Sequence, residues 1–375
     1  MSRMKALLVG GSGATGVLIA QGLAERGYDL TILHRGAHEP PELEPFRHIH
    51  ADPHFVEPIA EALGSETFDV VVLAYGRLKV IAPLFAGRCE RLLAIGGMPI
   101  YPGYLDPAAE KPRGMPILAR EDGPLVEPSR MISPGAAKFA AKMLDAENAV
   151  MEQHRAGGYA ASIFRYPAIY GRRAMGLTDW SVVRRALDGR PFILLPDAGK
   201  GIIARCAAEN AAWCVLAALD CEAAKGEAFN CADEEQYTLA QWAELILDVL
   251  GASMELVPIP PQVNWAAAHL LPLGGSCSDH GLLDISKARR ILGYRDQIRA
   301  KDALAHTIRW RRANPPSESE LANWADPLDY ALEDRIKAEL DGLLARLEDV
   351  KQAPEVVHPY PHPKEPGLTV DHRGR

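Results

Sequence analysis

Short apolar runs alternate with segments of helical periodicity along the first half of the chain. The apolar runs predict strands over residues 5–9, 30–33, 48–51, 69–74, 91–95 and 161–165. The amphipathic segments predict helices from about residue 14, over 56–63 and over 136–155. Because the runs are almost purely apolar, each strand is expected to be buried on both faces. The pattern therefore predicts an α/β fold built on a doubly wound parallel Rossmann sheet.

The second half mixes elements and ends in a charged segment. Helices are predicted over 180–187, 209–219, 239–250 and 286–292, and a strand over 227–230. Residues 98–134 are rich in proline and glycine, so we expect a long functional loop there, a candidate substrate lid. Ser317 and Glu320 have capping-box spacing, which predicts one long helix to about Val350. The Pro- and His-rich tail that follows predicts either disorder or an arm lying across a neighbour.

Composition and charge narrow the class of partner. The net charge is −8 and no Lys/Arg-rich run is present, so we expect a small-molecule ligand and neither nucleic acid nor a membrane surface. No apolar run is long enough to span a membrane or to act as a signal segment, and a cytoplasmic protein is expected. No metal site is expected either, because the tail histidines lack ligand spacing and the cysteines form no CxxC pair. The six cysteines are Cys89, Cys206, Cys214, Cys221, Cys231 and Cys277.

Three glycines directly after the first predicted strand carry the clearest motif. In GGSGATG they precede a predicted helix, which is the context in which such glycines hold the pyrophosphate of a dinucleotide. The first glycine permits a tight turn, the second lets the backbone approach the pyrophosphate, and the third packs helix on strand. A glycine-rich turn without a ligand is the alternative. The loop residues expected to contact the cofactor are Gly10, Ser12, Gly13, Ala14, Thr15 and Gly16.

The end of the second predicted strand discriminates between NAD and NADP. An NAD-selective site carries an acidic residue there, whereas this chain has His34 and Arg35. Arg35 can stack on adenine and pair with a 2′-phosphate, to which Ser12 can also donate, so NADP is favoured and NAD is the alternative. A solvated surface arginine is the other interpretation. Asp52, which ends the third strand, is either an acceptor for the adenine amine or a turn residue.

Several segments together resemble the extended short-chain dehydrogenases/reductases of the NAD-dependent epimerase/dehydratase type. They are the glycine spacing, the strand FDVVVLA, the segment FRYPAIYG at 164–171, the segment GEAFNCADEEQYTLAQWAELI, and SKARRILGY at 286–294. The resemblance covers roughly residues 4–313. It implies a nicotinamide cofactor, a smaller C-terminal substrate domain and frequently a homodimer, to which the C-terminal extension can contribute. Further cofactor contacts are expected at Ala74, Tyr75, Gly76, Lys142, Tyr166, Pro167 and Ile169.

This organisation predicts three regions in the chain. We expect the dinucleotide-binding Rossmann domain over 1–170, a substrate domain over 171–314 that is interleaved with the last Rossmann elements, and a helical extension with its tail over 315–375.

The catalytic positions depart from the family. The resemblance implies a Ser or Thr after the fifth strand and a Tyr-x-x-x-Lys on the next helix, where the tyrosine exchanges a proton with the substrate oxygen. Here Gly97 lies at the serine position, and the helix has no tyrosine. If Lys142 is aligned with the family lysine, Lys138 lies at the tyrosine position. If Lys138 is aligned with the lysine instead, Pro134 lies at the tyrosine position. We prefer the first alignment because acidic residues follow Lys142.

Three functions remain open. In the first, the protein is an oxidoreductase acting on a carbonyl or hydroxyl group of a small metabolite, with a replacement proton donor among Tyr101, Tyr104, Lys138 and Tyr170. A sugar-nucleotide epimerase or dehydratase is the closest enzymatic alternative. In the second, hydride transfer is retained for chemistry that needs no strong acid, such as reduction of an already activated carbon, an isomerisation or an elimination. In the third, the protein binds cofactor without turnover, as a sensor or scaffold.

Two arginines are candidates for contacting an anionic group of a substrate. They are Arg165 and Arg205. Ion pairing within the protein is the preferred interpretation for each.

Overall fold

Seven parallel strands form the central sheet of this computed structural model, which describes residues 3–37, 39–272, 278–322, 324–350 and 364–370. The strand order is β10-β6-β5-β4-β1-β2-β3, in which β1 to β6 have the Rossmann arrangement, so the predicted doubly wound sheet is confirmed. Cys277 and most of the predicted tail lie outside the described residues. The strands are β1 (Lys5–Val9), β2 (Asp29–His34), β3 (Arg47–His50), β4 (Phe68–Leu73), β5 (Cys89–Gly97), β6 (Ala160–Tyr166) and β10 (Glu227–Asn230).

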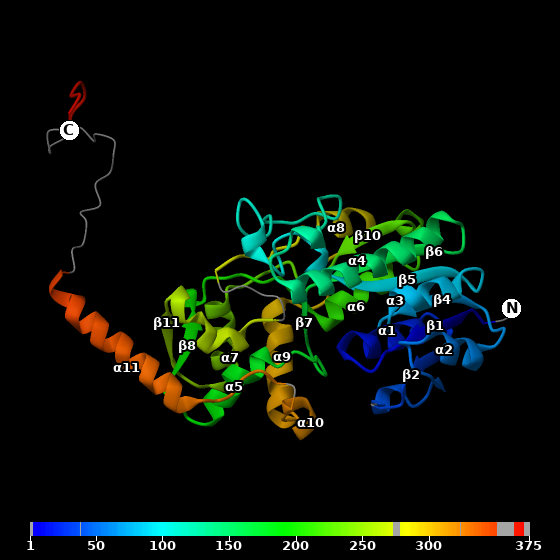
Figure 1. Ribbon diagram of the computed structural model, residues 1–375, viewed down its shortest axis with the longest axis horizontal. Helices are drawn as coiled ribbons and strands as arrows, with labels where there is room; N and C mark the ends of the chain where they lie inside the picture. Colours follow the sequence, from blue (N-terminus) through cyan, green and yellow to red (C-terminus); the bar gives the residue numbers. More distant parts are fainter. Residues whose placement is uncertain (1–2, 38, 273–277, 323, 351–363, 371–375) are drawn as a thin grey trace. The chain divides into compact units, whose positions relative to one another are not determined.

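Alternate residues of each strand enter two different cores. In β1, Ala6 and Leu8 pack toward α1 and α6, whereas Leu7 and Val9 pack toward α2, α3 and α4, and all four are fully buried. Burying one aliphatic side chain stabilises the folded state by about 1.5–3 kcal/mol. The two cores together therefore hold helices on both faces of the sheet (Figure 1). The helices are α1 (Ala14–Glu25), α2 (Val56–Leu63), α3 (Leu78–Ile81), α4 (Pro134–Arg155) and α6 (Ala208–Ala217).

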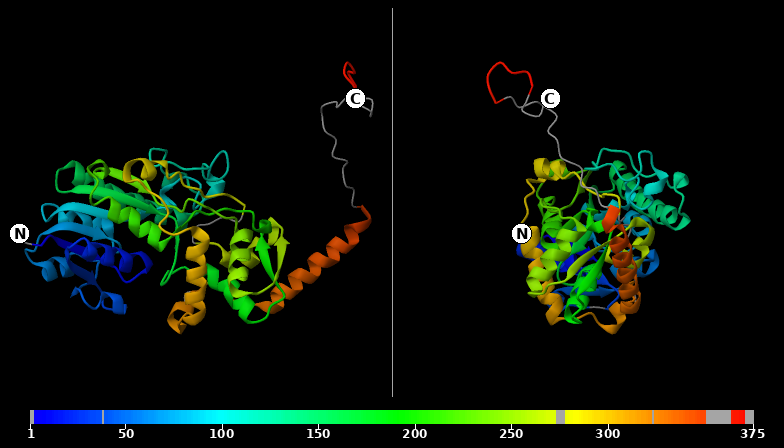
Figure 2. Two further views of the ribbon diagram at one scale, coloured as in Figure 1. Left: turned by 180° about the vertical axis from the view of Figure 1, so that it is seen from behind. Right: turned by 90° about the vertical axis from the view of Figure 1, so that its left-hand side faces the viewer.

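Most elements after β6 build a second region at the other end of the same unit, apart from β10, α6 and the helix Ser286–Leu292, which belong to the sheet end (Figures 1 and 2). Two parallel strand pairs, β7 with β9 and β8 with β11, belong to it. These four strands and helix α9 are not predicted from the sequence, because two of the strands have only three residues and the other two lack period-two alternation. Its elements are β7 (Ala168–Tyr170), α5 (Thr178–Leu187), β8 (Phe192–Pro196), β9 (Arg205–Ala207), α7 (Leu239–Leu250), β11 (Glu255–Ile259) and α9 (Ala300–Ala313). Helix α8 (Ser286–Leu292) packs against β10 and α6.

The predicted single long helix after Ser317 is wrong. The capping box itself is confirmed, since the Ser317 N–H donates to Glu320 Oε2 at 2.8 Å, but the helix it opens is only α10 (Glu318–Leu321). A separate helix, α11 (Tyr330–Leu347), begins after Pro327. Proline disfavours the helical conformation in the residue before it, and this interrupts the helix.

The chain divides into two compact units, Met1–Leu328 and Asp329–Arg375. The expected domain limits at residues 170 and 314 stay a prediction. Among the described helices, none is long and apolar enough to cross a membrane.

Residues 98–134 form the expected long connection, but it is packed against the rest of the unit. Tyr101, Tyr104, Met115 and Ala119 are all nearly inaccessible and share a small core with residues of the second region, among them Leu283. The connection contains three short 3₁₀ turns. It therefore behaves as a fixed wall of the molecule in this structure.

A buried chain of polar contacts holds this connection to the sheet. Arg165 of β6 donates from Nη2 to Glu147 Oε2 of α4 at 2.9 Å, and from Nη1 to the Tyr101 hydroxyl oxygen at 2.9 Å. The Tyr101 hydroxyl donates to Asn230 Oδ1 at 2.6 Å, and Asn230 Nδ2 donates to the carbonyl of Ala119 at 2.9 Å. The preferred interpretation of Arg165, an internal ion pair, is confirmed.

Gly96 contributes to this network through its missing side chain. A Cβ at Gly96 would lie 2.9 Å from Glu147 Oε1. Glycine is therefore required at this point of β5, since a side chain there would displace the carboxylate from Arg165.

Glu147→Gln should lower the free energy of unfolding by about 3–5 kcal/mol, because Arg165 keeps its charge but loses its buried carboxylate. Chemical denaturation measures the change. Asp145→Asn on the same helix is the matched control: it breaks the exposed pair with Lys79, which is worth less than about 1 kcal/mol. Equal small losses in both variants would contradict a structural role for the buried pair.

Candidate functional site

The glycine loop between β1 and α1 has the geometry expected of a cofactor-binding turn. Gly10 has a φ of +96° and donates its N–H to the carbonyl of Leu33 at 2.8 Å. Only glycine adopts this backbone conformation without strain. A Cβ at Gly16 would come within 2.3 Å of the Gly11 Cα, so the third glycine of the motif lets α1 pack against its own loop.

Gly13 differs from its neighbours because nothing in the protein requires a glycine there. Its φ of −83° suits any residue, and no described atom lies within 4 Å of a Cβ built on it. The adjoining start of α1 has no side-chain cap and no acidic residue in its first turn. The first N–H groups of the helix can donate hydrogen bonds to an anion, and a phosphate close to the backbone would fill the space at Gly13. The loop thus fits a dinucleotide.

A second group of predicted cofactor residues gathers at the ends of β2, β3 and β4. Arg35 lies 5.8 Å from the centre of the exposed Tyr75 ring, and its Nη2 is 3.5 Å from the Tyr75 hydroxyl. A Cβ at Gly10 would lie 2.7 Å from Tyr75 Cβ, which places this aromatic ring beside the glycine loop. Asp52 accepts hydrogen bonds from both the backbone N–H and the Nδ1 of His54. These bonds are those of a turn residue, one of the two roles considered for Asp52.

His34 is oriented away from this rim. The Gly36 N–H donates to His34 Nδ1 at 3.0 Å, so the His34 proton is on Nε2, which lies 2.7 Å from His48 Nδ1; His48 Nε2 in turn lies 2.9 Å from the carbonyl of Leu43. Burial lowers the pKa of His34 and favours this neutral state. Four potential metal ligands lie within 4.8 Å of one another here, but these hydrogen bonds account for the packing of the rings. The four are His34, Glu39, His48 and His50.

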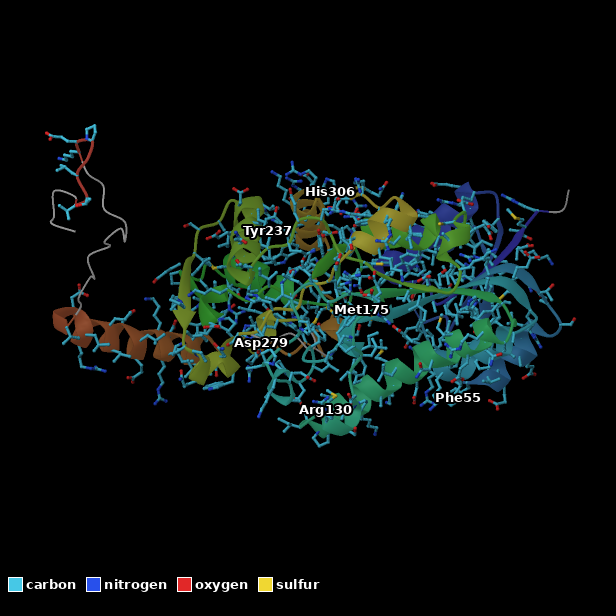
Figure 3. The ribbon with its side chains drawn as sticks, turned by 90° about the horizontal axis from the view of Figure 1, so that it is seen from above. Phe55, Arg130, Met175, Tyr237, Asp279 and His306 are labelled. Atoms are coloured by element: carbon cyan, nitrogen blue, oxygen red, sulfur yellow. The ribbon has the colours of Figure 1, made fainter. Side chains whose placement is uncertain are left out.

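A cavity of about 270 Å³ opens at the carboxyl ends of β5 and β6. This is the edge at which open α/β sheets bind their ligands. Most of the lining is apolar or aromatic, and three predicted cofactor residues, Tyr166, Pro167 and Ile169, belong to it. The chain crosses to the second region beside it, near the exposed Met175 (Figure 3). The cavity is lined by Met98, Pro99, Tyr104, Tyr166, Pro167, Ala168, Ile169, Tyr170, Gly176, Thr178, Asp179, Arg205 and Pro272.

Two of the tyrosines proposed as proton donors line this cavity, and one does not. Tyr104 and Tyr170 are in the lining, whereas the Tyr101 hydroxyl belongs to the buried network of Arg165. Burial raises the pKa of Tyr101 and of Tyr104 to about 12. The Tyr170 hydroxyl donates to Asp233 Oδ2 at 2.7 Å, and burial raises its pKa strongly. All three phenols therefore hold their protons tightly.

The structure does not bring the two candidate lysines of α4 to the cavity. Ala140 is fully buried. Lys138 and Lys142 each lie two residues from it, about 200° around the helix, and both are exposed. Opposite Gly97 the helix presents Met143, whose Cε would lie 3.4 Å from a Cβ at Gly97. In the described chain, this edge therefore lacks the serine, tyrosine and lysine that the family resemblance implies.

Sequence reasoning missed Asp179, because its position at the start of a short helix carries no motif. Asp179 Oδ1 accepts from the indole N–H of Trp242 at 2.7 Å in the cavity wall, and burial raises the pKa of its carboxyl. The Arg205 guanidinium lies 4.6 Å from the centre of the same Trp242 ring. Within the described residues no ion pair is found for Arg205, which differs from the preferred interpretation of that residue.

The two glycines of the loop should respond differently to the same substitution. Gly13→Ala should leave the melting temperature of the protein without cofactor unchanged, since the added methyl group meets no protein atom, but it should weaken NADPH binding about ten-fold or more by crowding the pyrophosphate. Gly16→Ala should instead lower the melting temperature, because its methyl group collides with backbone. Thermal melts and NADPH titrations measure both; unchanged NADPH affinity in Gly13→Ala would contradict the assignment.

Comparisons with known proteins agree with this architecture. No family model matches the chain. A 3-diazoavenalumate denitrifying reductase from a Streptomyces species is 25% identical over 311 residues, which cover 78% of this chain and 96% of that protein. A UDP-glucose 4-epimerase from Thermotoga maritima superposes with a TM-score of 0.66 at 16% identity, over 83% of this chain and 99% of that chain.

Two structures with bound NAD are also similar. A UDP-glucuronic acid 4-epimerase from Bacillus cereus has a TM-score of 0.63 at 16% identity, covering 83% of this chain and 99% of its own. A dTDP-glucose 4,6-dehydratase from Bacillus anthracis has a TM-score of 0.64 at 13% identity, covering 83% and 97%. With its Rossmann strand order and its glycine loop, the chain thus has the fold of the extended short-chain dehydrogenases/reductases of the epimerase/dehydratase type, as its motifs predicted.

Proposed function

We propose that the protein is an NADPH-preferring reductase that transfers hydride to an already activated carbon of a small metabolite. One observation carries this proposal: the cavity at the carboxyl ends of β5 and β6 lies at the same edge of the sheet as the glycine loop but has no serine, tyrosine and lysine set among its described lining. A reaction that requires no proton donor is compatible with such a cavity. Reduction of a carbonyl is less so, because the oxygen must gain a proton as hydride arrives.

The cofactor part of the proposal rests on the glycine loop and on Arg35. The loop leaves space for a pyrophosphate at Gly13, and structural neighbours with the same fold contain NAD. At the end of β2 this chain presents an arginine, and its guanidinium can form charge-assisted hydrogen bonds with a 2′-phosphate. This supports NADP over NAD.

The reductase relative suggests a type of activated carbon. By its name it acts on a diazo compound and removes nitrogen. Bound NADPH would supply the hydride for such a reaction: a C–H bond forms as the C–N bond breaks, its electron pair leaves with N₂, and no proton is transferred. The cavity walls would exclude water and hold the ring of the substrate, while the buried tyrosines keep their protons.

The cavity volume disfavours a sugar-nucleotide substrate. Sites for small organic ligands enclose about 300–1,000 Å³, and this cavity, at about 270 Å³, lies just below that range. A small aromatic or aliphatic metabolite fits it better than a nucleoside diphosphate sugar. An epimerase function is for this reason the second choice.

Arg35→Asp should weaken NADPH binding about 10- to 100-fold while changing NADH affinity little, because a charge-assisted bond to the 2′-phosphate is replaced by repulsion. Titrations with both cofactors measure the effect. Arg130→Asp changes the net charge equally at an exposed site (Figure 3) and should leave both affinities unchanged. Equal losses of NADPH and NADH affinity in Arg35→Asp would remove Arg35 from 2′-phosphate recognition.

Hydride transfer can be traced with NADPH carrying deuterium at C4, prepared separately for each face of the ring. With a diazo-substituted aromatic acid as substrate, one of the two deuterated NADPH preparations should transfer deuterium to the carbon that held nitrogen, with release of N₂. Lys138→Ala should keep the rate and its pH profile, because this side chain faces away from the sheet. Hydrogen from solvent at that carbon, or a changed pH profile in Lys138→Ala, would contradict direct transfer without a lysine acid.

A further inference from the structure

The wall of the cavity contains a buried cation. Arg205 is 5% exposed and lines the cavity at the start of β9. Gln236 fixes its backbone on both sides, since Gln236 Oε1 accepts from the Arg205 N–H at 2.8 Å and Gln236 Nε2 donates to its carbonyl at 2.9 Å. The guanidinium lies over Trp242 and donates from Nη1 to the carbonyl of Ile203 at 3.3 Å. The side chain is therefore held in one place.

This arginine differs from two other buried arginines of the same unit; a third, Arg91, also has no ion pair within the described residues but lies outside the cavity lining. Arg165 lies 2.9 Å from Glu147, and Arg185 lies 2.6 Å from Asp326. No carboxylate oxygen of the described chain lies within the 4.0 Å ion-pair distance of the Arg205 guanidinium. Removing a cation from water costs several kcal/mol unless an anion or hydrogen bonds compensate it. One backbone carbonyl, the face of an indole and the charge of Asp179, which lies beyond ion-pair distance, compensate only part of that cost.

We propose that Arg205 binds the single anionic group, a carboxylate or a phosphate, of a small and otherwise apolar substrate. The proposal rests on the reductase function above and names the substrate class of the same cavity. A guanidinium presents parallel N–H groups that match two oxygens of such an anion. The rest of the lining, with Met98, Pro99, Ile169 and the tyrosine rings, suits an apolar ring attached to it.

Asp179 sets the strength of this recognition. It is the one carboxylate in the described lining, and the Trp242 indole N–H holds it on the same wall as Arg205. Its negative charge opposes a bound anion, whereas the Arg205 charge attracts one. The two residues therefore predict effects of opposite sign when each is neutralised, which a purely structural role would not produce.

The test uses the full-length protein saturated with NADP⁺ and three probes of similar size: benzoate, phenyl phosphate and the uncharged benzamide. Calorimetric titration should show the preferred anion binding about ten-fold or more tightly than benzamide, as expected for hydrogen bonds to a charged group. Arg205→Met should abolish that preference, and Asp179→Asn should increase it. The ratio between benzoate and phenyl phosphate shows whether the natural group is a carboxylate or a phosphate.

Two further variants keep the result interpretable. Arg205→Lys retains the charge without the two-pronged geometry and should keep a reduced preference, which tests the idea even if Arg205→Met fails to fold. Arg130→Met removes an exposed arginine and should match the wild type. Equal binding of benzamide and both anions by the wild type, no binding of any probe, or an unchanged preference in both Arg205 variants would overturn the proposal. These titrations need no turnover, so failure of the hydride-transfer experiment leaves them informative.

Discussion

The ion pair between Arg165 and Glu147 is the interaction on which the arrangement of the site depends. Both side chains are almost inaccessible, so each charge is tolerated only because the other, with further hydrogen bonds, replaces water. Through Tyr101 and Asn230 the same arginine joins α4 and β6 to the long connection after β5 and to the end of β10. The connection begins with Met98 and Pro99, which line the cavity. One buried pair thus helps to fix the wall against which a substrate would lie.

Different parts of this fold position the groups expected to bind the cofactor and those expected to donate a proton. The loop that would hold the pyrophosphate depends on backbone conformation and on close approach, both of which the glycines retain. Proton donation depends on side chains of β5 and α4, and there the chain has Gly97 and a helix whose lysines face outward. A fold that still presents a dinucleotide site can in this way serve a different reaction, because the site and not the fold determines chemistry.

Part of the site could be read from the sequence. The glycine loop was recognisable because its spacing, the strand before it and the helix after it are all local, and Arg35 follows from counting along the chain. Arg205 was noticed only as one of two arginines that could contact an anion, and Asp179 was not noticed. Trp242 holds both side chains in the cavity wall, although it lies 37 or more residues away from each in sequence. No local pattern encodes such a contact.

The Rossmann sheet and its glycine loop follow from the sequence alone, because apolar runs, helix periodicity and glycine spacing are patterns within a few neighbouring residues. The tertiary structure alone decided the rotation of α4. Counting residues aligns Lys138 or Lys142 with the catalytic positions, but the face of α4 that contains Ala140 is buried, and both lysines are exposed to solvent. The same packing brings Arg205 and Asp179 to one cavity wall without a direct ion pair between them, since burial and pairing depend on which distant segments meet. The local pattern specifies the elements, and their packing specifies which side chains reach the site.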